Sequence, residues 1–566
     1  MRAFFTTALA AATLALTVGP AALAQSYNTS ALQFSLLPSA RSVQTGDVAT
    51  VFGTVLSTID QTGCELVLGG ATPGVTLAWR LLDENNQLTG DGENANFAMN
   101  GTNGRRQNLL VAMSSATAIN TSEIEVFVRC PNDVANPSFD FYRNPIYPGV
   151  NTLALTVSSA PAPDIIVIGQ SLTSDGYVRL PSPGARRPAA ISAVNIGATA
   201  TVEVSANTGP YNLPVTLQVC ETNASGVCTS PRAESLSVNF ATNEVRTFNV
   251  YVQSTGERGV PDMPAIARTY FNFGQPAAAG DEGPGAASVG PQYTTRYGTT
   301  SFAILASGPE TNGSEIGGVY RGLINGGGGG PAGAVPAMIV IPNPNNSTIA
   351  ISQTDAYGWA ATSQGAILPI NAQTGSRAFG HTSLAYANGL SPRRQATNSL
   401  NRNDGNIFPR AGIRGAVTNF FNSPISFSYQ AIYDPIAEQV ISGNLTSDGA
   451  AIIGQTFDVF YQGVDIGDAS TGSETGGGGA VGSGSITFPG QTQACDVAVV
   501  NLRQSTELTT WVFSFNRGPE CTVPTYEGYG YVDDTRGPRR IELLVYPRTI
   551  EDGAIDTFPL TLVARQ

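Results

Sequence analysis

The sequence predicts an all-β protein, in which two Ig-like β-sandwiches are followed by a C-terminal antiparallel β-barrel or curled-sheet region. The first observation is the two-residue alternation from Ile124 to Cys130, which places four apolar side chains on one face of a strand. The second is the recurrence of short segments rich in Val, Ile, Thr and aromatic residues, separated by Gly- and Asn-containing turns. The third is the scarcity of helical periodicity with capping residues.

The cysteines strengthen this prediction. Cys130 lies in register with the apolar face of its strand, and Cys64 shares a face with Leu66 and Leu68. Two inward-facing cysteines on two strands predict a disulfide inside a β-sandwich. Pairing by neighbourhood is a hypothesis, because six cysteines allow other connectivities. The predicted pairs are Cys64–Cys130, Cys220–Cys228 and Cys495–Cys521.

Residues 1–24 have the pattern of a secretory signal peptide. Arg2 supplies a positive charge, Ala8 to Val18 is a short apolar run, and Ala22-Leu23-Ala24 is a small-x-small cleavage site. The run is too short to span a bilayer, and no later segment reaches that length. We therefore expect an exported chain, periplasmic or extracellular and at the cell surface, with no transmembrane segment after signal cleavage. Export makes disulfides the expected state of the cysteines.

Composition excludes several functional classes. The formal net charge is -13, which disfavours nucleic acid and anionic membranes as partners. The basic residues are all Arg, so a phosphate-binding or Schiff-base lysine is excluded. His381 is the single histidine. A zinc site of the usual His/Cys type therefore has almost no ligands available, and a Ser-His-Asp triad would have to use His381 as its base. We expect no cofactor and assign no metal ligands, with calcium left open because Asn401 to Asn406 is rich in side-chain oxygens but lacks the EF-hand pattern.

Residues 25–162 are predicted to form the first sandwich. A turn at Ser42 to Gly46 leads into a strand at Val48 to Leu56, and Val150 to Val157 closes the domain. Ala160 to Pro163 is predicted to be a stiff linker.

Residues 163–308 are predicted to form the second sandwich. Val215, Leu217 and Val219 point to one side of a strand, so Cys220 points to the other. This predicts that Cys220 and Cys228 form an exposed staple across a hairpin. The Ala-, Gly- and Pro-rich stretch from Gln275 to Pro291 is interpreted as a hairpin loop in preference to a linker, because an apolar strand resumes after it.

Residues 309–566 are predicted to form a meander of short strands, which is typical of a barrel or curled sheet. A glycine run at Gly476 to Gly479 divides this region into two halves in one interpretation. Within it, Gly375 to Gly415 is interpreted as a long polar loop that either binds a sugar or is disordered. The candidate ligand residues of this loop are Phe379, His381, Tyr386, Arg393, Arg394, Asn398 and Asn403.

The chain resembles uncharacterised exported proteobacterial proteins built from Ig-like, CARDB-like sandwiches and small β-barrel-like modules. The resemblance covers most of the mature chain and supports the fold prediction, but it implies no activity. It is carried by Arg41 to Gly46 with Phe52, Thr62 to Cys64, Phe127 to Cys130, Val202 to Gly209, Leu213 to Cys220 with Cys228, and the Gly-x-Tyr-x-Gly pattern at Gly318 to Gly322.

Two functions follow as hypotheses. The first is a non-catalytic structural, adhesion or binding protein of the bacterial envelope or extracellular space, whose partners are other envelope proteins or glycans. The alternative is a glycan-binding module or glycan-active enzyme in the C-terminal region.

Overall fold

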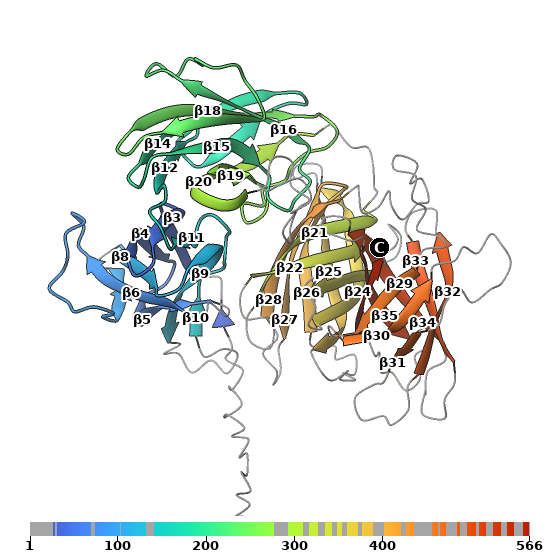
Figure 1. Ribbon diagram of the computed structural model, residues 1–566. Helices are drawn as coiled ribbons and strands as arrows, with labels where there is room; N and C mark the ends of the chain where they lie inside the picture. Colours follow the sequence, from blue (N-terminus) through green and yellow to red (C-terminus); the bar gives the residue numbers. More distant parts are fainter. Residues whose placement is uncertain are drawn as a thin grey trace, which may run out of the picture.

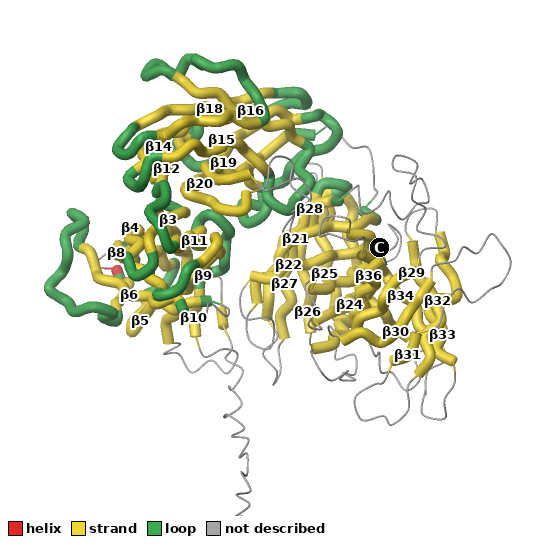
Figure 2. Tube along the Cα trace, in the orientation of Figure 1, coloured by secondary structure: helices red, strands yellow, loops and turns green. Residues whose placement is uncertain are grey.

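A computed structural model describes most of the chain, and its regular secondary structure consists of β-strands (Figure 2). The predicted all-β class is therefore confirmed for these residues. The described residues are 27–28, 31–69, 74–101, 104–131, 141–276, 293–308, 316–326, 334–341, 348–353, 359–371, 376–388, 401–419, 426–434, 456–461, 464–470, 484–486, 495–504, 509–516, 525–533, 540–547 and 558–564. Residues 1–24 lie outside this set, so the signal peptide stays a prediction.

Sandwich 1 packs two sheets face to face. The larger sheet follows the order β1-β10-β9-β11-β3, with β5 joining β9 and β7 joining β5, and the smaller follows β2-β4-β8-β6. The strands are β1 (Tyr27–Asn28), β2 (Leu32–Leu37), β3 (Ala40–Gln44), β4 (Val48–Ser57), β5 (Gln61–Leu68), β6 (Val75–Leu82), β7 (Phe97–Met99), β8 (Arg106–Ser115), β9 (Ile119–Pro131), β10 (Phe141–Arg143) and β11 (Thr152–Ser158).

The predicted inward face of β9 forms part of the core of sandwich 1. Ile124, Val126 and Val128 are buried, as is Cys130, which is bonded to the equally buried Cys64. Glu65 pairs with Arg129 across β5 and β9, so the two cysteines face each other on adjacent strands of one sheet, with a Cα–Cα distance of 4.1 Å. The disulfide therefore ties two neighbouring strands and does not cross between the sheets.

Sandwich 2 has a sheet of order β12-β14-β18-β16 and a sheet of order β13-β20-β19-β15-β17. Tyr270 pairs with Ser301 and Asn272 with Thr299 in the antiparallel β19–β20 hairpin. The interpretation of the intervening stretch as a hairpin connection is thus correct. The strands are β12 (Ile165–Gln170), β13 (Tyr177–Leu180), β14 (Arg186–Asn195), β15 (Ala200–Asn207), β16 (Val215–Thr222), β17 (Ser235–Phe240), β18 (Val245–Ser254), β19 (Arg268–Pro276) and β20 (Tyr293–Ala306).

The second disulfide, Cys220–Cys228, is present but is not an exposed staple. Cys220 does lie on the outer face of β16, yet its side chain is fully buried, while Cys228 is half-buried. The segment after β16 pairs with the edge of this strand at Ala233, and its turn lies over the outer face, where Asn249 beside Cys220 donates from Nδ2 to the carbonyl of Gly226. The Cys220 side chain therefore points away from the core of sandwich 2 but is covered by the segment that follows β16.

The C-terminal region forms two closed eight-stranded barrels in sequence order. Barrel 1 closes by pairing β21 with β28, and barrel 2 by pairing β29 with β36. The strands of barrel 1 are β21 (Gly318–Gly326), β22 (Ala334–Ile341), β23 (Thr348–Gln353), β24 (Trp359–Asn371), β25 (Ser376–Asn388), β26 (Asn401–Phe408), β27 (Gly412–Asn419) and β28 (Ser426–Tyr433). Those of barrel 2 are β29 (Thr456–Tyr461), β30 (Val464–Ser470), β31 (Gly484–Ile486), β32 (Cys495–Gln504), β33 (Thr509–Asn516), β34 (Thr525–Asp533), β35 (Arg540–Pro547) and β36 (Phe558–Ala564).

The division between the barrels does not fall at the glycine run. Gly476 to Gly479 lie between β30 and β31, outside the described residues, so the run interrupts barrel 2. The boundary lies between β28 and β29, because ring closure by hydrogen bonding defines each module.

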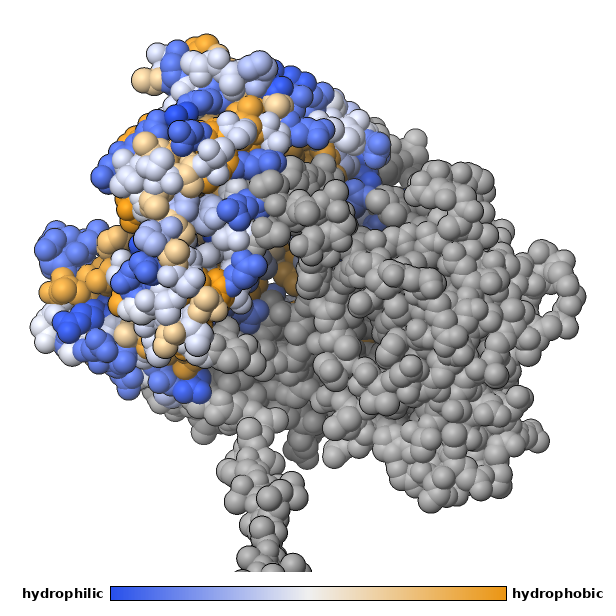
Figure 3. Space-filling model, in the orientation of Figure 1, coloured by the Kyte–Doolittle hydropathy of each residue, from blue (hydrophilic) through white to orange (hydrophobic). Residues whose placement is uncertain are grey.

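Sandwich 2 lies above sandwich 1 and barrel 1 in Figure 1, and barrel 2 lies on the far side of barrel 1 from sandwich 1. The two barrels contact each other at β24 and β36. On the face of the sandwiches seen in Figure 3, hydrophilic and hydrophobic residues are interspersed.

Replacing Cys64 and Cys130 with Ala should lower the free energy of unfolding of sandwich 1 by about 4 kcal/mol, because their bond closes a long loop in the unfolded chain. The sequence separation is 66 residues, against 8 for Cys220 and Cys228. Urea unfolding without reductant measures the loss, with Cys220→Ala/Cys228→Ala as the control, for which the same relation gives about 2.5 kcal/mol. A larger loss in the control would contradict this account.

Candidate functional site

The predicted ligand loop is instead part of the wall of barrel 1. Phe379 and His381 lie on β25 and Asn403 lies on β26, and all three side chains are buried. The interpretation of residues 375–415 as one long irregular loop is therefore wrong. These strands contain Gly, Ala, Ser and Asn where β-branched residues are usual, so their alternation carries little propensity for a strand.

A polar cluster forms inside barrel 1 where these residues meet Tyr429. His381 pairs with Asn403 across β25 and β26, and the Tyr429 hydroxyl donates a hydrogen bond of 2.8 Å to Asn403 Oδ1. Burial raises the pKa of Tyr429 well above its usual range, so this phenol stays neutral. The rings of Phe379 and His381 lie 5.2 Å apart between centroids.

Glycines make room for these rings. A Cβ atom on Gly405 would lie 2.7 Å from Phe379 Cζ, and one on Gly415 would lie 2.5 Å from the Tyr429 hydroxyl. The neighbouring inward side chains are apolar and buried. The barrel core is therefore packed around its polar cluster in this region, as expected for a small eight-stranded barrel.

The carboxylates that the structure shows to be buried lie outside this cluster. Among the described residues, the buried carboxylates are Asp164 and Asp434, and each is paired with an arginine. Asp404 follows Asn403 in sequence but is exposed, on the outer face of β26.

The remaining predicted residues are only partly covered by the structure. Tyr386 lies within β25, whereas Arg393, Arg394 and Asn398 lie outside the described residues. Cys495 begins β32 and Cys521 lies outside, so their pairing stays a prediction. No group of His, Cys, Asp and Glu side chains in the described part of the chain is arranged to hold a metal ion.

The strongest polar site lies where the two sandwiches meet, and sequence reasoning missed it. Arg41 of β3 donates from Nη2 to Asp164 Oδ2 at 2.8 Å and from Nε to both carboxylate oxygens. The backbone N–H of Ser42 donates to Asp164 Oδ1 at 3.0 Å. The side chains of Arg41 and Asp164 are only 9% and 8% exposed. Arg41 borders a predicted turn and Asp164 follows the predicted linker, so nothing in the sequence indicated that their side chains would meet.

Asp164 is itself fixed in sandwich 2 at the end of the linker. Its N–H donates to Asn195 Oδ1 and its carbonyl oxygen accepts from the N–H of Ile196. The carbonyl of Ala162 accepts from the N–H of Ala198. The linker is thus hydrogen-bonded to Ser158 of sandwich 1 at Ala160 and to sandwich 2 at Ala162, so it does not act as a free spacer.

Sandwich 1 also covers an edge of β20. Ser39 Oγ donates to the carbonyl of Thr299, and Thr156 Oγ1 donates to the carbonyl of Arg296. The N–H of Arg296 donates to Thr121 Oγ1 at 2.9 Å. These side chains supply partners that a further strand would otherwise provide, so the docking of sandwich 1 protects backbone groups of β20.

Thr121 is held in an unusual backbone conformation at this edge. Its φ of 36° lies in the left-handed region, which is rare for a β-branched residue and costs about 1–3 kcal/mol. The hydroxyl is fixed between Arg296 N and Thr156 Oγ1, the latter at 2.6 Å. The strained backbone thus places the Thr121 hydroxyl where it hydrogen-bonds to sandwich 2.

The loop before β11 meets both sandwich 2 and barrel 1. Ser301 Oγ donates to the carbonyl of Gly149, whose φ is 70°, and a Cβ at Gly149 would lie 2.9 Å from the ring of Tyr270. The N–H of Ile146 donates to Oδ1 of Asn325 in β21 at 3.0 Å. One loop of sandwich 1 therefore contacts two other modules.

Barrel 1 is joined to sandwich 2 by a shared apolar core. Leu323 of β21 and Ile432 of β28 belong to the same buried cluster as the interior of sandwich 2. A Cβ on Gly412 would lie 2.8 Å from Met263 Cε, which shows how closely the two modules approach. Nearby, Arg321 and Asp434 form a buried ion pair with an N–O distance of 3.0 Å.

The fold and this network define the class as an all-β, disulfide-bonded protein of docked sandwich and barrel modules. No family model and no curated protein matches the chain. Among solved structures it is similar to one described as "Crystal Structure of Rst D1-D2", with 8% identity, coverage of 49% of this chain and 100% of that chain, and a TM-score of 0.13. A likeness this weak carries no argument about fold or function. No helix among the described residues is long and apolar enough to cross a membrane.

Asp164→Asn should weaken the docking of sandwich 1 on sandwich 2 by about 3–5 kcal/mol, because the Arg41 guanidinium is left buried without its counter-charge. Hydrogen exchange of the Ser42 amide, which donates to Asp164, measures this loss directly.

The matched control is Asp60→Asn. Asp60 pairs with Arg105 at 2.8 Å, but these side chains are 62% and 45% exposed, so the expected change is at most about 1 kcal/mol. Equal effects of the two variants would show that the buried pair does not hold the sandwiches together.

Tyr270→Phe should reduce the loss of stability in alkali. Burial raises the pKa of Tyr270 to about 12, against about 10 in the unfolded chain. The folded state therefore retains the proton between these values, so stability is full below pH 10 and falls as the pH rises towards 12, by roughly 2–3 kcal/mol. Denaturant unfolding at several pH values tests this. Tyr251→Phe is the matched control. The prediction is refuted if the free energy of unfolding of Tyr270→Phe falls between about pH 10 and pH 12 as steeply as that of the wild type.

Proposed function

We propose that this protein is a non-catalytic, exported scaffold or binding protein, in which docked β-modules hold recognition surfaces in a fixed arrangement. The observation that carries the proposal is the buried Arg41–Asp164 pair, which closes the junction between the sandwiches. A chain of independent modules would need no buried ion pair at its linker, because a mobile junction is solvated.

Further contacts support a fixed arrangement. Sandwich 1 hydrogen-bonds to both sandwich 2 and barrel 1, through Ser301 to Gly149 and through Ile146 to Asn325. Sandwich 2 and barrel 1 share an apolar cluster. Three modules thus contact one another pairwise, and bending at one junction disturbs the other two.

Export is supported by compatible features. The N-terminal sequence has the signal-peptide pattern, and the two disulfides are of the kind that persist in an oxidising compartment. Envelope proteins or glycans are the partners that this location would offer.

The alternative of a glycan-active C-terminal region is less well supported. Of its seven candidate ligand residues, Phe379, His381 and Asn403 are buried in the wall of barrel 1, whereas Arg393, Arg394 and Asn398 lie outside the described residues. We therefore place recognition on the outer surfaces of the modules.

Fractionation of the source cells tests location. The mature chain is expected to begin near Gln25, to be found with the envelope or the medium, and to resist thiol alkylation until it is reduced. Recovery in the cytoplasm with free thiols would refute the export proposal.

A screen of the full mature chain against polysaccharides is expected to show no hydrolysis, and turnover by the purified protein would refute the non-catalytic assignment.

A further inference from the structure

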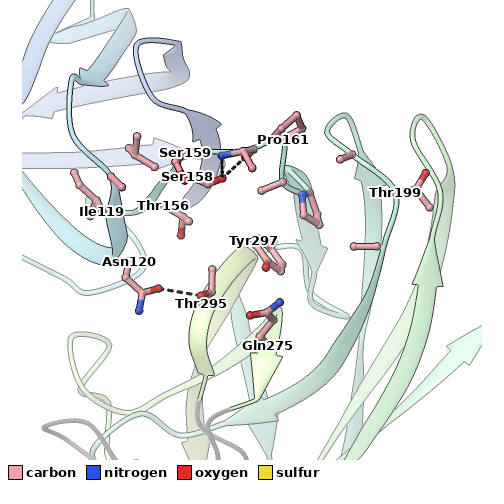
Figure 4. A pocket seen from close by; sticks show the side chains of 17 residues that line it. Ile119, Asn120, Thr156, Ser158, Ser159, Pro161, Thr199, Gln275, Thr295 and Tyr297 are labelled. Carbon is pink, nitrogen blue, oxygen red and sulfur yellow. Dashed lines mark hydrogen bonds between the residues drawn. The ribbon is translucent and has the colours of Figure 1, made fainter.

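A cleft of about 570 Å³ opens between the two sandwiches beside the linker (Figure 4). Asn120 and Thr156 belong to sandwich 1, Ser159 lies between β11 and the linker, and Gln275 and Tyr297 belong to sandwich 2. In Figure 4, Tyr297 and Gln275 occupy the centre, Ser159 and Pro161 lie above them, and Thr199 faces them from the right. This volume lies within the range of roughly 300–1,000 Å³ typical of small-ligand sites.

The floor of the cleft is built in advance of any ligand. Thr295 Oγ1 donates to Asn120 Oδ1 across the junction at 2.9 Å, and Thr156 donates to the carbonyl of Arg296. Thr121, beside Asn120, has the strained backbone described above. A ligand would therefore meet side chains that are already positioned, which lowers the entropy cost of binding.

The chemistry of the walls selects for a neutral ligand. None of the described residues that line the cleft carries a formal charge. The nearby charges of Arg296 and Glu123 neutralise each other in an ion pair of 2.8 Å. A phosphate, a carboxylate or a cation would lose its hydration in the cleft without gaining a counter-charge.

The walls combine hydrogen-bonding groups with apolar surface. Amides and hydroxyls come from Asn120, Gln275 and Ser159, which are exposed. Between them lie Pro161, several alanines and the ring of Tyr297, which is only 7% exposed and so belongs to the floor. A sugar presents the same mixture, because its ring carries apolar C–H faces surrounded by hydroxyls.

An extended peptide is a poorer fit. β11 pairs with β3 and β9, β15 pairs with β17 and β19, and an edge of β20 is occupied by side chains of sandwich 1. The walls thus offer no open strand edge with which a peptide backbone could form a ladder.

We propose that this cleft binds a neutral saccharide of about disaccharide size, with both sandwiches and the linker contributing contacts. The site lies far in sequence from the residues first considered for sugar binding. This proposal gives the scaffold a specific class of ligand. It rests on the proposed function in one respect, which is that an exported protein meets such sugars. A ligand held by both walls would also stiffen the junction.

Calorimetric titration of the mature, disulfide-bonded chain tests the proposal, with cellobiose, maltose and N,N′-diacetylchitobiose as probes. At least one is expected to bind saturably, and a uronic-acid disaccharide is expected to bind more weakly than its neutral counterpart. Hydrogen exchange with the bound probe should show protection at residues 118–120, 158–160 and 295–297.

Gln275→Ala and Ser159→Ala remove hydrogen-bonding groups from the wall and the linker. Each is expected to weaken binding by about 2- to 10-fold, the equivalent of one hydrogen bond. Gln218→Ala, on the outer face of β16, is the matched control and should leave the affinity unchanged.

The absence of saturable binding by all three neutral probes would overturn the proposal, as would binding that both wall variants leave unchanged or protection confined to other surfaces. Any of these results obtained with a chain that is still exported and non-hydrolytic would leave the proposed function standing.

Discussion

The covering of β20 by sandwich 1 is the constraint on which the arrangement of the modules depends. Backbone groups along a strand edge need partners, and here they come from the hydroxyls of Ser39, Thr121 and Thr156. The Arg41–Asp164 pair lies in the same junction and is shielded from water. Hydrogen bonds to fixed backbone positions tolerate little sliding, so this interface specifies one register between the sandwiches where an apolar contact alone would allow several.

Barrel 1 is likewise fixed by contacts with both sandwiches. β21 faces the interior of barrel 1 on one side and the sandwiches on the other, with Leu323 in the core of sandwich 2 and Asn325 bonded to Ile146. A strand that is buried on both faces cannot shift without disturbing two modules. The short approach between Gly412 and Met263 adds a steric limit. The pairwise contacts make the sandwiches and barrel 1 a single mechanical unit.

The described interior of barrel 1 is filled by the barrel's own side chains. Gly405 and Gly415 leave space that the rings of Phe379 and Tyr429 occupy, and isoleucines line the surrounding interior. His381 and Asn403 are part of this packing. Because these side chains are buried, they do not meet solvent, whereas the described residues of the cleft between the sandwiches present uncharged polar side chains to it.

Several strands of each sandwich, the inward pairing of Cys64 with Cys130 and the meander of the C-terminal region could be predicted from the sequence, because two-residue alternation indicates which face of a strand meets a core. The sequence could not reveal the burial of Cys220, the closure of two barrels, or the place of His381 and Asn403 in a barrel wall. Those features depend on which elements meet across long sequence separations. Arg41, Asp164 and Thr121 resemble solvent-facing residues of turns and linkers until a second module covers them, so only the tertiary structure decided that they form the junction.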